Sequence, residues 1–278
     1  MMELSIKEYK NKYKSVISDF ITDNSFVRED IVGCLDRWPQ YGLIVKGEYG
    51  VLAVGVFSGE SKTTSMTLYV KASKRKEGIG SMLIKSIEES MRNVGVEEVV
   101  CDFKANELEK SFLYKNGYKH WFYSNFMTYT GGKLAVANHE IINYEDKYYG
   151  ECQKVFSESF HKMRLLVGLE STLSLPSEEE RKEYKENAEN IFVLRDSNKI
   201  VAVVRLEGNE IDAVAVSVED QGKGYGKSLV SYAVDKLLDR GCSKVHLWVV
   251  EGNSAKFLYE KLDFITERTH EFVIKSIK

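Results

Sequence analysis

The chain has 278 residues, of which 43% are hydrophobic and 29% are charged, which is ordinary for a globular protein and sufficient for two domains. A formal net charge of −3 gives no electrostatic reason to expect nucleic acid or an anionic membrane surface as a partner. No apolar run approaches the roughly 20 residues of a spanning helix, and the lysine-rich start does not resemble a signal peptide, so we expect a cytoplasmic protein without membrane contacts.

The first half alternates apolar runs with amphipathic stretches. Helical material is expected to about Asp36, before three strands. The stretch Gly80–Val94 carries its apolar residues at the helical period of 3.6 and is followed by Gly95, a favourable C-terminal cap. The later elements predicted for this half are strands at 41–46, 51–57 and 65–70, helices at 80–94 and 108–116, and strands at 96–101 and 121–129.

The second half repeats this order after Thr130-Gly131-Gly132, a small and unpatterned stretch that we predict as the domain boundary. The predicted strands lie near 133–143 and at 191–195, 199–206, 210–218, 244–250 and 264–275, and the helices at 144–160, 227–240 and 254–261, with an irregular acidic stretch up to about 190. Strands alternating with helices predict an α/β (α+β) fold, and adjacent strands predict a mixed, mostly antiparallel sheet flanked by helices in each half.

The two halves share one residue pattern at an offset of 146 positions. The matching pairs are Val70 with Val216, Arg75 with Gln221, Gly78 with Gly224, Gly80 with Gly226, Gly95 with Gly241, and Tyr118 with Phe264. A repeat of this length indicates a duplicated domain, because solenoid units span only about 20–50 residues. We therefore predict an N-terminal domain at 1–132 and a C-terminal domain at 133–278.

A glycine-rich turn lies between a predicted strand and a predicted helix of the second half. Its residues are Gln221, Gly222, Lys223, Gly224, Tyr225, Gly226, Lys227 and Ser228. Unpaired backbone N–H groups and the helix dipole favour a phosphate or diphosphate there, and glycines allow the main chain to approach it closely. Lys223 and Lys227 add positive charge.

Two known phosphate-binding patterns do not fit this turn. A Walker P-loop requires glycine at the position of Gln221, and a dinucleotide fingerprint requires glycine at Lys227 or Tyr225. Glycines present for turn geometry alone are a further alternative. The recurrence of the spacing at Arg75–Gly80 argues against that alternative.

The pattern Gln/Arg-x-x-Gly-x-Gly, between a strand and a helix, resembles the acetyl-CoA diphosphate loop of the GNAT superfamily of acyltransferases. The stretch Asn253–Phe264 is similar to the next motif of that family. The resemblance is strong over 210–264 and moderate over 65–118, and elsewhere only the strand order supports it. It implies tandem GNAT-like domains.

The resemblance also implies how acetyl-CoA binds as a co-substrate. In that family the pantetheine arm enters between two splayed strands, and here it would pair with the main chain of Val216, Ser217 and Val218. The thioester oxygen would accept a backbone N–H near Val216. The loop from Gln221 to Gly226 would hold the diphosphate. Asn253 would contact CoA, cap the following helix, or do both.

Two catalytic residues are implied in the same way. Tyr259 matches the general acid that protonates the departing thiolate, and its alternative role is an aromatic side chain packed on the sheet. Glu210, which precedes Gly224 by 14 positions (224 − 210), matches the general base of some members, with a solvent-exposed carboxylate or a water chain as alternatives. A base is needed because a primary ammonium has a pKa near 10.

The first half lacks these reactive groups at the same offset. Tyr259 corresponds to Leu113, Glu210 to Thr64 and Asn253 to Glu107. We therefore predict that the C-terminal half catalyses, and that the N-terminal half is catalytically degenerate and either supports the fold or binds CoA without turnover.

Cysteine and histidine positions predict no metal site. Cys34, Cys101, Cys152 and Cys242 form no Cys-x-x-Cys pair, and the five histidines include no pair at metal-ligand spacing. We expect reduced and mostly buried thiols.

The leading prediction is an acyl-CoA-dependent N-acyltransferase, with acetyl-CoA as the donor and a primary amine as the directly attacking acceptor. One alternative is a CoA-binding or regulatory protein without turnover, and another is a structural domain that binds neither. The acceptor stays open among small amines, amino acids, aminoglycosides and protein N-termini, and the segment 165–189 would border its site. The sequence does not indicate an oligomeric state.

Overall fold

The computed structural model describes residues 4–105 and 107–278, which form two compact units. Unit 1 comprises the chain up to Trp121 together with Glu271–Lys278, and unit 2 comprises Phe122–His270. The domains predicted from the repeat, 1–132 and 133–278, differ from these units at the last strand of each half. None of the helices in the described part of the chain is long and apolar enough to cross a membrane.

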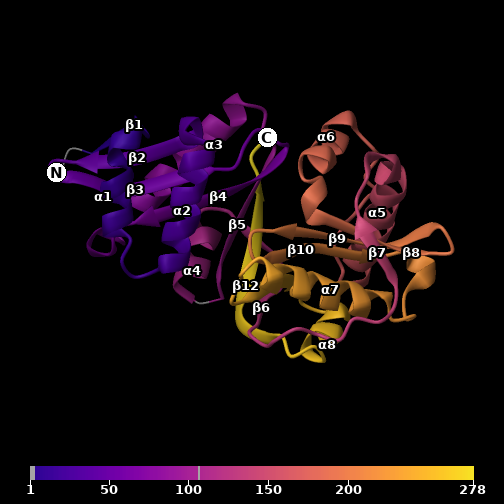
Figure 1. Cartoon of the computed structure of the whole chain (residues 1–278). Coiled ribbons are helices and arrows are strands. Elements are labelled where there is room, and N and C mark those ends of the chain that lie inside the picture. The colour runs from indigo at the N-terminus through magenta and orange to yellow at the C-terminus, as the bar shows by residue number, and fades with distance from the viewer. Residues whose placement is uncertain (1–3, 106) are drawn as a thin grey trace. The chain divides into compact units, whose positions relative to one another are not determined.

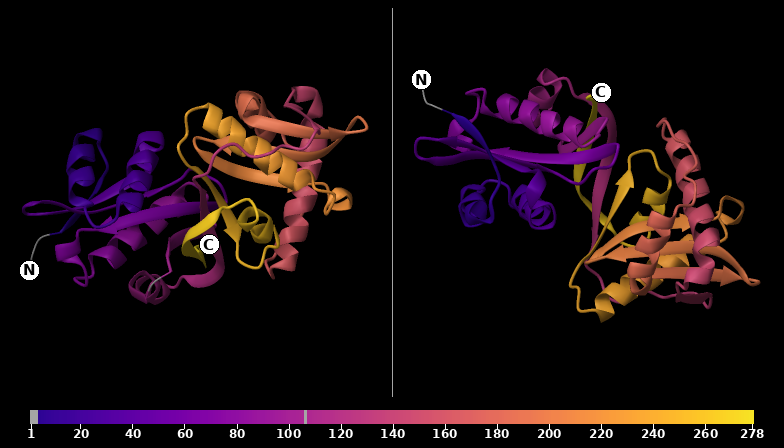
Figure 2. Two further views of the ribbon diagram at one scale, coloured as in Figure 1. Left: turned by 60° about the horizontal axis from the view of Figure 1, so that its bottom comes forward. Right: turned by 90° about the horizontal axis from the view of Figure 1, so that it is seen from above.

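Unit 1 is a mixed sheet with helices on both faces, as the right-hand view of Figure 2 shows. Its strands lie in the order β1-β2-β3-β4-β5-β12, of which β4 and β5 are parallel, while the pairs β1–β2, β2–β3 and β3–β4 are antiparallel. The bounds are β1 (Ser5–Glu8), β2 (Gly42–Gly47), β3 (Gly50–Phe57), β4 (Thr63–Val70), β5 (Glu98–Lys104) and β12 (Ile265–Ser276), with α1 (Lys14–Phe20), α2 (Ser25–Arg37), α3 (Ile79–Asn93) and α4 (Glu107–Lys115). Of β12, only the part from Glu271 belongs to unit 1.

Helix α3 packs on the sheet of unit 1 through the apolar stripe that the sequence predicts. Leu83, Ile84, Ile87 and Met91 are fully buried in one cluster. A Cβ atom at Gly55 of β3 would lie 2.3 Å from Ile87 Cδ1, so only glycine allows the helix to approach this closely. Helices α1 and α2 pack through a separate cluster on the opposite face.

Unit 2 has the same architecture, with α5 and α6 on one side of the sheet in Figure 1 and α7 and α8 on the other. Its strand order is β6-β11-β10-β9-β8-β7, and the β10–β11 pair is parallel whereas the others are antiparallel. The bounds are β6 (Lys119–Tyr129), β7 (Glu140–Asn143), β8 (Ile191–Asp196), β9 (Lys199–Glu207), β10 (Glu210–Val216) and β11 (Val245–Val250), with α5 (Tyr149–Leu166), α6 (Glu178–Glu186), α7 (Tyr225–Asp239) and α8 (Ala255–Glu260). Of β6, the part from Phe122 belongs to unit 2.

The predicted fold class is confirmed in both units, but two predicted elements are wrong. Residues 5–8, expected within helical material, form an edge strand on β2, where pairing outweighs weak local preference. The strand expected near 133–143 covers only Glu140–Asn143. The segment before it runs along α7, where the Leu134 N–H donates to Asp235 Oδ1 at 2.8 Å.

The end of the chain is part of the core of unit 1. Val273 and Ile277 are buried in the same cluster as the apolar face of α3. Arg92 Nε of α3 donates to the Ile277 carbonyl at 2.7 Å, and the Ile277 N–H donates to the Glu97 carbonyl at 2.9 Å. Unit 1 is therefore completed by residues that follow the whole of unit 2 in the sequence.

Lys275 neutralises a buried carboxylate in that core. Its Nζ lies 2.7 and 2.8 Å from the two carboxylate oxygens of Glu88, which is 3% exposed, and 2.9 Å from the Asn116 carbonyl. The Tyr118 hydroxyl donates to Glu88 Oε1 at 3.1 Å. At the offset of 146, the corresponding residues of unit 2 are apolar or aromatic, namely Val234, Phe264 and Tyr129.

Candidate active site

Strands β10 and β11 separate shortly after they begin. Their register contains only the pairs Glu210–His246 and Ile211–Leu247, although β10 continues to Val216 and β11 to Val250. A gap therefore opens between two neighbouring strands of unit 2. Backbone groups on the edge of β10 that faces β11 lie along this gap without a strand partner.

A β-bulge at Asp212 decides which groups those are. The pairing of β10 with β9 shifts by one residue between Ile211 and Ala213, so Asp212 is the extra residue. Before the bulge, the His246 N–H of β11 donates to the Asn209 carbonyl at 3.0 Å. After the bulge, the residues whose main-chain groups would otherwise have faced β11 face β9, and the residues between them face the gap.

The reversed alternation directs Val214 and Val216 toward the gap. The Ser217 N–H donates to the Val201 carbonyl of β9 at 2.8 Å. Along an antiparallel pair, every second residue bonds to the partner strand, so Ala215 also faces β9. The N–H groups of Val214 and Val216 consequently face the gap, and Ser217, predicted to bind through its main chain, has its N–H committed to the sheet.

Sequence reasoning missed Val214. Counting back by two from Val216 would have found it, because alternate residues of a strand share an edge. The Val216 carbonyl, also on that edge, accepts hydrogen bonds from Ser159 Oγ of α5 at 2.6 Å and from Gln221 Nε2 at 3.3 Å.

The glycine-rich loop follows directly on β10 and leads into α7. Gly222 and Gly224 have φ of +83° and +90°, in the left-handed region that other residues occupy only with strain. Gly224 is the N-cap of α7, and residues 221–224 are exposed. A Cβ at Gly226 would lie 3.5 Å from both Leu258 Cδ2 and Val216 Cγ2, so the first turn of α7 adjoins both α8 and the end of β10.

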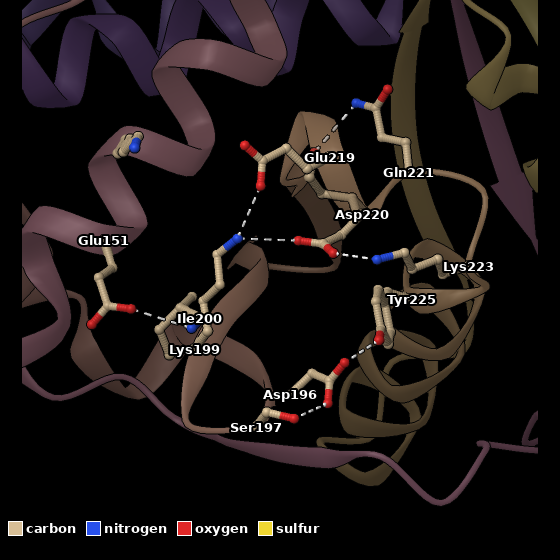
Figure 3. A network of polar contacts seen from close by, with 12 residues as sticks. Glu151, Asp196, Ser197, Lys199, Ile200, Glu219, Asp220, Gln221, Lys223 and Tyr225 are labelled. Atoms are coloured by element: carbon tan, nitrogen blue, oxygen red, sulfur yellow. Dashed lines mark hydrogen bonds and ion pairs between the residues drawn. The ribbon is translucent and has the colours of Figure 1, made fainter.

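The charged residues around this loop are largely paired with one another, as Figure 3 shows. Lys223 Nζ lies 2.7 Å from Asp220 Oδ1, and Lys199 Nζ lies 3.5 Å from Asp220 Oδ2 and 3.4 Å from Glu219. The predicted charge of Lys223 is therefore neutralised by Asp220 in this structure. The side chain of Lys227 is exposed on the first turn of α7.

Two other predicted loop residues direct their side chains elsewhere. The Tyr225 hydroxyl donates to Asp196 Oδ2 at 2.5 Å (Figure 3), and Ser228 Oγ lies 2.8 Å from His139 Nδ1. Both residues are buried. The Tyr225 N–H nevertheless belongs to the first turn of α7, whereas the Ser228 N–H donates to the Gly224 carbonyl at 3.1 Å.

Helix α8 forms the wall of the site next to the first turn of α7. Asn253 Oδ1 accepts from the Ala255 N–H at 3.0 Å, so Asn253 caps the start of α8. Tyr259 is 8% exposed, and its ring lies 6.0 Å from that of Phe264. Burial raises the pKa of the Tyr259 hydroxyl to about 12, so it stays protonated at neutral pH.

The C-terminal end of α5 covers the loop end of the gap on the face opposite α7. Ser159 bonds to β10, Lys162 Nζ donates to Gln221 Oε1 at 3.0 Å, and Val167 Cγ1 lies 3.5 Å from a Cβ built on Gly252, just after β11. A cavity of about 650 Å³ adjoins this cover, and its lining includes His161, Leu165, Leu166, Leu173, Val218 and Glu219. At its other end, near Glu210, the gap is closed by the pairing of β10 with β11.

Glu210 lies at that other end, and its carboxyl group binds a proton more tightly than an ordinary glutamate does. Burial, together with the negative charges of Asp212 and Glu207, raises its pKa to about 7, although the positive charge of Arg268 opposes the shift. Asp212 itself pairs with Arg205 Nε at 2.5 Å. A carboxyl group with this pKa accepts and releases protons near neutral pH.

The raised pKa of Glu210 predicts a pH-dependent stability difference for Glu210→Gln. Because the folded protein holds this proton more tightly than the unfolded chain does, wild-type stability falls as the pH rises from about 4.5 to about 7. Gln cannot ionise, so we expect the variant to gain thermal stability relative to wild type at pH 8 but not at pH 4. Melting temperatures at both pH values measure this, and an equal difference at both would contradict it.

Unit 1 keeps the backbone geometry of this site. Strands β4 and β5 pair only from Thr63–Glu98 to Ser65–Val100 and then separate, and the loop after β4 has positive φ at Lys76 (+65°) and Gly78 (+83°). Lys76 thus holds the left-handed conformation that Gly222 holds in unit 2 (222 − 146 = 76).

Reactive side chains are absent from the corresponding described positions of unit 1. Leu113 stands in the place of Tyr259 and is buried. Ser65 pairs with Val100 as Glu210 pairs with His246, so Ser65 is the structural counterpart of Glu210. The constant offset points to Thr64 instead, because the bulge in β10 shifts the match by one residue.

One family model matches both halves of the chain. The model of the acetyltransferase (GNAT) family matches residues 8–118 and 156–264. An acetyltransferase of Yersinia enterocolitica is 39% identical over 57 residues, which are 20% of this chain and 40% of that protein. A ribosomal protein bS18 alanine N-acetyltransferase of Haemophilus influenzae is 41% identical over 51 residues, 18% of this chain and 35% of its own. The chain thus matches less than half the length of these relatives.

Two solved structures resemble the whole chain. A GCN5-related N-acetyltransferase from Sphaerobacter thermophilus has a TM-score of 0.75 at 17% identity, covering 99% of this chain and 96% of its own. A tandem GNAT protein of the clavulanic acid biosynthesis pathway has a TM-score of 0.67 at 14% identity and covers 99% of both chains. At these identities the likeness concerns the fold, including its tandem arrangement.

Proposed function

The chain belongs to the acetyltransferase (GNAT) family, and from that membership we propose that unit 2 transfers the acyl group of acetyl-CoA to a primary amine. The observation that carries this proposal is the gap between β10 and β11, along which the N–H groups of Val214 and Val216 have no strand partner and at whose end the glycine-rich loop begins. We propose that unit 1, which lacks counterparts of Tyr259 and Glu210, is catalytically degenerate.

Acetyl-CoA would bind along this gap as an added strand. Its pantetheine arm would pair with the main chain of Val216 and Val218, with Ser217 between them facing β9. Its diphosphate would meet the N–H groups of the loop and of the first turn of α7, with Lys227 nearby. Lys223, which is paired with Asp220 in this structure, would add a positive charge if its side chain turned to the phosphates. The loop residues proposed for this contact are Gln221, Gly222, Lys223, Gly224, Tyr225, Gly226, Lys227 and Ser228, with Asn253 from the opposite wall.

The reaction would proceed by direct attack of the amine. Glu210 accepts a proton from the acceptor's ammonium group, directly or through a water molecule. The neutral amine then forms a nitrogen–carbon bond to the thioester carbon, and the Val214 N–H stabilises the negative oxygen. The carbon–sulfur bond breaks, and the departing thiolate receives a hydrogen bond and then a proton from Tyr259. The acylated nitrogen loses its second proton, which restores the Tyr259 hydroxyl. The acceptor is a small-molecule or peptide amine. The relative named as a ribosomal-protein alanine N-acetyltransferase acylates an amine of a protein.

The proposal predicts opposite outcomes for two matched proline substitutions. Val214→Pro removes a gap-facing N–H and leaves the ladder to β9 intact, so we expect kcat to fall about 10²- to 10³-fold, as for loss of an oxyanion donor. Leu68→Pro removes the equivalent group of unit 1 and should leave turnover unchanged, because unit 1 is not the catalytic unit. Release of free thiol from acetyl-CoA with a panel of primary amines measures both.

Calorimetric titration with acetyl-CoA separates the alternatives. Binding with thiol release supports an acyltransferase, whereas binding without thiol release for every amine would indicate the CoA-binding or regulatory protein. Absence of binding to the wild-type protein would remove both. If Leu68→Pro rather than Val214→Pro abolished turnover, the assignment of the catalytic unit would be wrong.

A further inference from the structure

We propose that His246 is a second proton-handling residue of this reaction, which takes the acceptor's proton from Glu210 and passes it to solvent. The inference rests on the proposed function, in which Glu210 is the base. Each turnover loads one proton onto Glu210, and that proton must leave before the next ammonium group can be deprotonated. The geometry around β10 and β11 points to His246 as the group that removes it.

The two side chains are neighbours on one face of the sheet. Glu210 and His246 are directly paired residues of the parallel strands β10 and β11, whose spacing is about 4.8 Å. Paired residues of adjacent strands project to the same side. The adjoining residues Val245 and Leu247 are buried in the cluster under α7, so the His246 ring lies on the opposite face, and it is half-buried there.

Two contacts fix the orientation of the imidazole ring. Its Nδ1 lies 2.9 Å from Thr128 Oγ1 of β6, and its face stacks on Phe126 with ring centroids 4.8 Å apart at 26°. Thr128 and Phe126 are 3% and 8% exposed, so neither support is free to move away. The ring is thereby held in place by one nitrogen, which leaves Nε2 to exchange a proton.

The Thr128 hydroxyl can keep its hydrogen bond to Nδ1 of His246 whether the imidazole is neutral or protonated. A threonine hydroxyl both donates and accepts hydrogen bonds. It can donate to Nδ1 when the neutral ring carries its hydrogen on Nε2, and it can accept from Nδ1 in the other tautomer and in the imidazolium ion. The contact with Thr128 is therefore kept through a cycle in which Nε2 gains and loses a proton.

Charged groups of both signs surround Glu210 and His246 and influence their protonation states. Asp212 of β10, Glu207 of β9 and Arg268 of β12 act on Glu210, and Asp212 is itself paired with Arg205. Glu267 and Arg268 of β12 and Lys244 before β11 act on His246, where burial is the main cause of a lowered pKa. Burial raises the pKa of Glu210 to about 7 and lowers that of His246 below its usual value, so Glu210 holds the proton more tightly and transfer to His246 is uphill until His246 releases the proton to solvent.

Unit 1 has neither a carboxylate nor an imidazole at the two corresponding positions. The residues opposite each other at the same place of β4 and β5 are Ser65 and Val100. The second proton carrier thus occurs in the unit that we propose as catalytic.

Kinetics of His246→Gln and chemical rescue of His246→Gly test the inference. We expect His246→Gln to lower kcat/KM at pH 7 at least about tenfold and to remove one inflection from its pH profile. Added imidazole should restore His246→Gly several-fold, which a purely structural role would not permit. Thr128→Val should show an intermediate loss, and Thr128→Ser, which keeps the hydroxyl, should show little.

A matched control is His120→Gln in unit 1, where the imidazole Nδ1 lies 3.0 Å from Glu271, and it should leave the profile unchanged. If the wild-type protein releases no thiol from acetyl-CoA with any amine, the proposed function fails. If the wild type is active while His246→Gln keeps its kcat/KM and both inflections, or if imidazole does not restore folded His246→Gly, the role of His246 is refuted and the proposed function stands.

Discussion

Replacing Tyr259 with phenylalanine is expected to lower kcat by about 10²- to 10⁴-fold, the range for loss of a general acid, with little change in KM for acetyl-CoA. The ring would still pack against Phe264. Only the hydroxyl that meets the departing sulfur would be lost. Stopped-flow or steady-state measurement of thiol release gives the result.

The pKa of Tyr259 determines how that acid acts. At about 12 it exceeds the reference value of about 8.5 for a thiol, so full proton transfer is uphill by roughly 5 kcal/mol. The hydroxyl would therefore stabilise the thiolate first as a hydrogen-bond donor. Because Tyr259 stays neutral throughout the neutral range, Tyr259→Phe should reduce the height of the pH profile and leave the inflection of Glu210, near 7, in place.

Tyr232→Phe is the matched control, since it removes the hydroxyl of a partly buried tyrosine on α7 that packs edge-to-face against Phe192. It should retain wild-type kcat. If Tyr259→Phe is as active as this control, Tyr259 is a packing residue and another group, or water, protonates the thiolate.

Lys275→Ala is expected to destabilise unit 1 by about 3–5 kcal/mol, the cost of leaving a buried carboxylate without its counter-charge. Glu88 is 3% exposed and has Lys275 as its closest cationic partner at 2.7 Å, with Arg92 at 3.7 Å. A residue three positions from the end of the chain would thus control the stability of the N-terminal half. Hydrogen exchange should show faster opening of α3 and β5 than of α7.

The apolar arrangement of unit 2 provides the control. Glu88→Val combined with Lys275→Tyr copies the residues found at Val234 and Tyr129, and it removes the carboxylate together with its partner. Most of the stability lost in Lys275→Ala should return, because replacing both ions of a buried pair by apolar groups is often neutral. Equal losses in the single and the double variant would show that the ion pair is not what Lys275 contributes.

Local features of the site could be predicted from the sequence alone. The apolar residues of α3 and α7 repeat every three or four positions, so the helical face that they form is visible in the sequence and packs on a neighbouring sheet. Glycine at 222 and 224 reports a positive φ directly, because other residues rarely hold it. The duplicated spacing then identified two copies of one strand–loop–helix unit, and the family match to both halves confirms this.

Other features depend on which strands lie beside one another, and the sequence does not contain that information locally. The bulge at Asp212 exists only relative to β9, yet it directs Val214 to the gap. The pKa of Glu210 is set by its burial and by Asp212, Glu207 and Arg268, which lie on three different strands, and its paired residue His246 lies on a fourth.

What the sequence determined by itself is the identity of the repeating units and the position of their glycine loops, since backbone conformation and helical periodicity act over a few residues. What only the tertiary structure decided is which atoms face the gap, which carboxyl group has a pKa near 7, and that 271–278 belongs to unit 1. These outcomes depend on strand pairing and on exclusion of water, and both arise from residues that are distant in the chain.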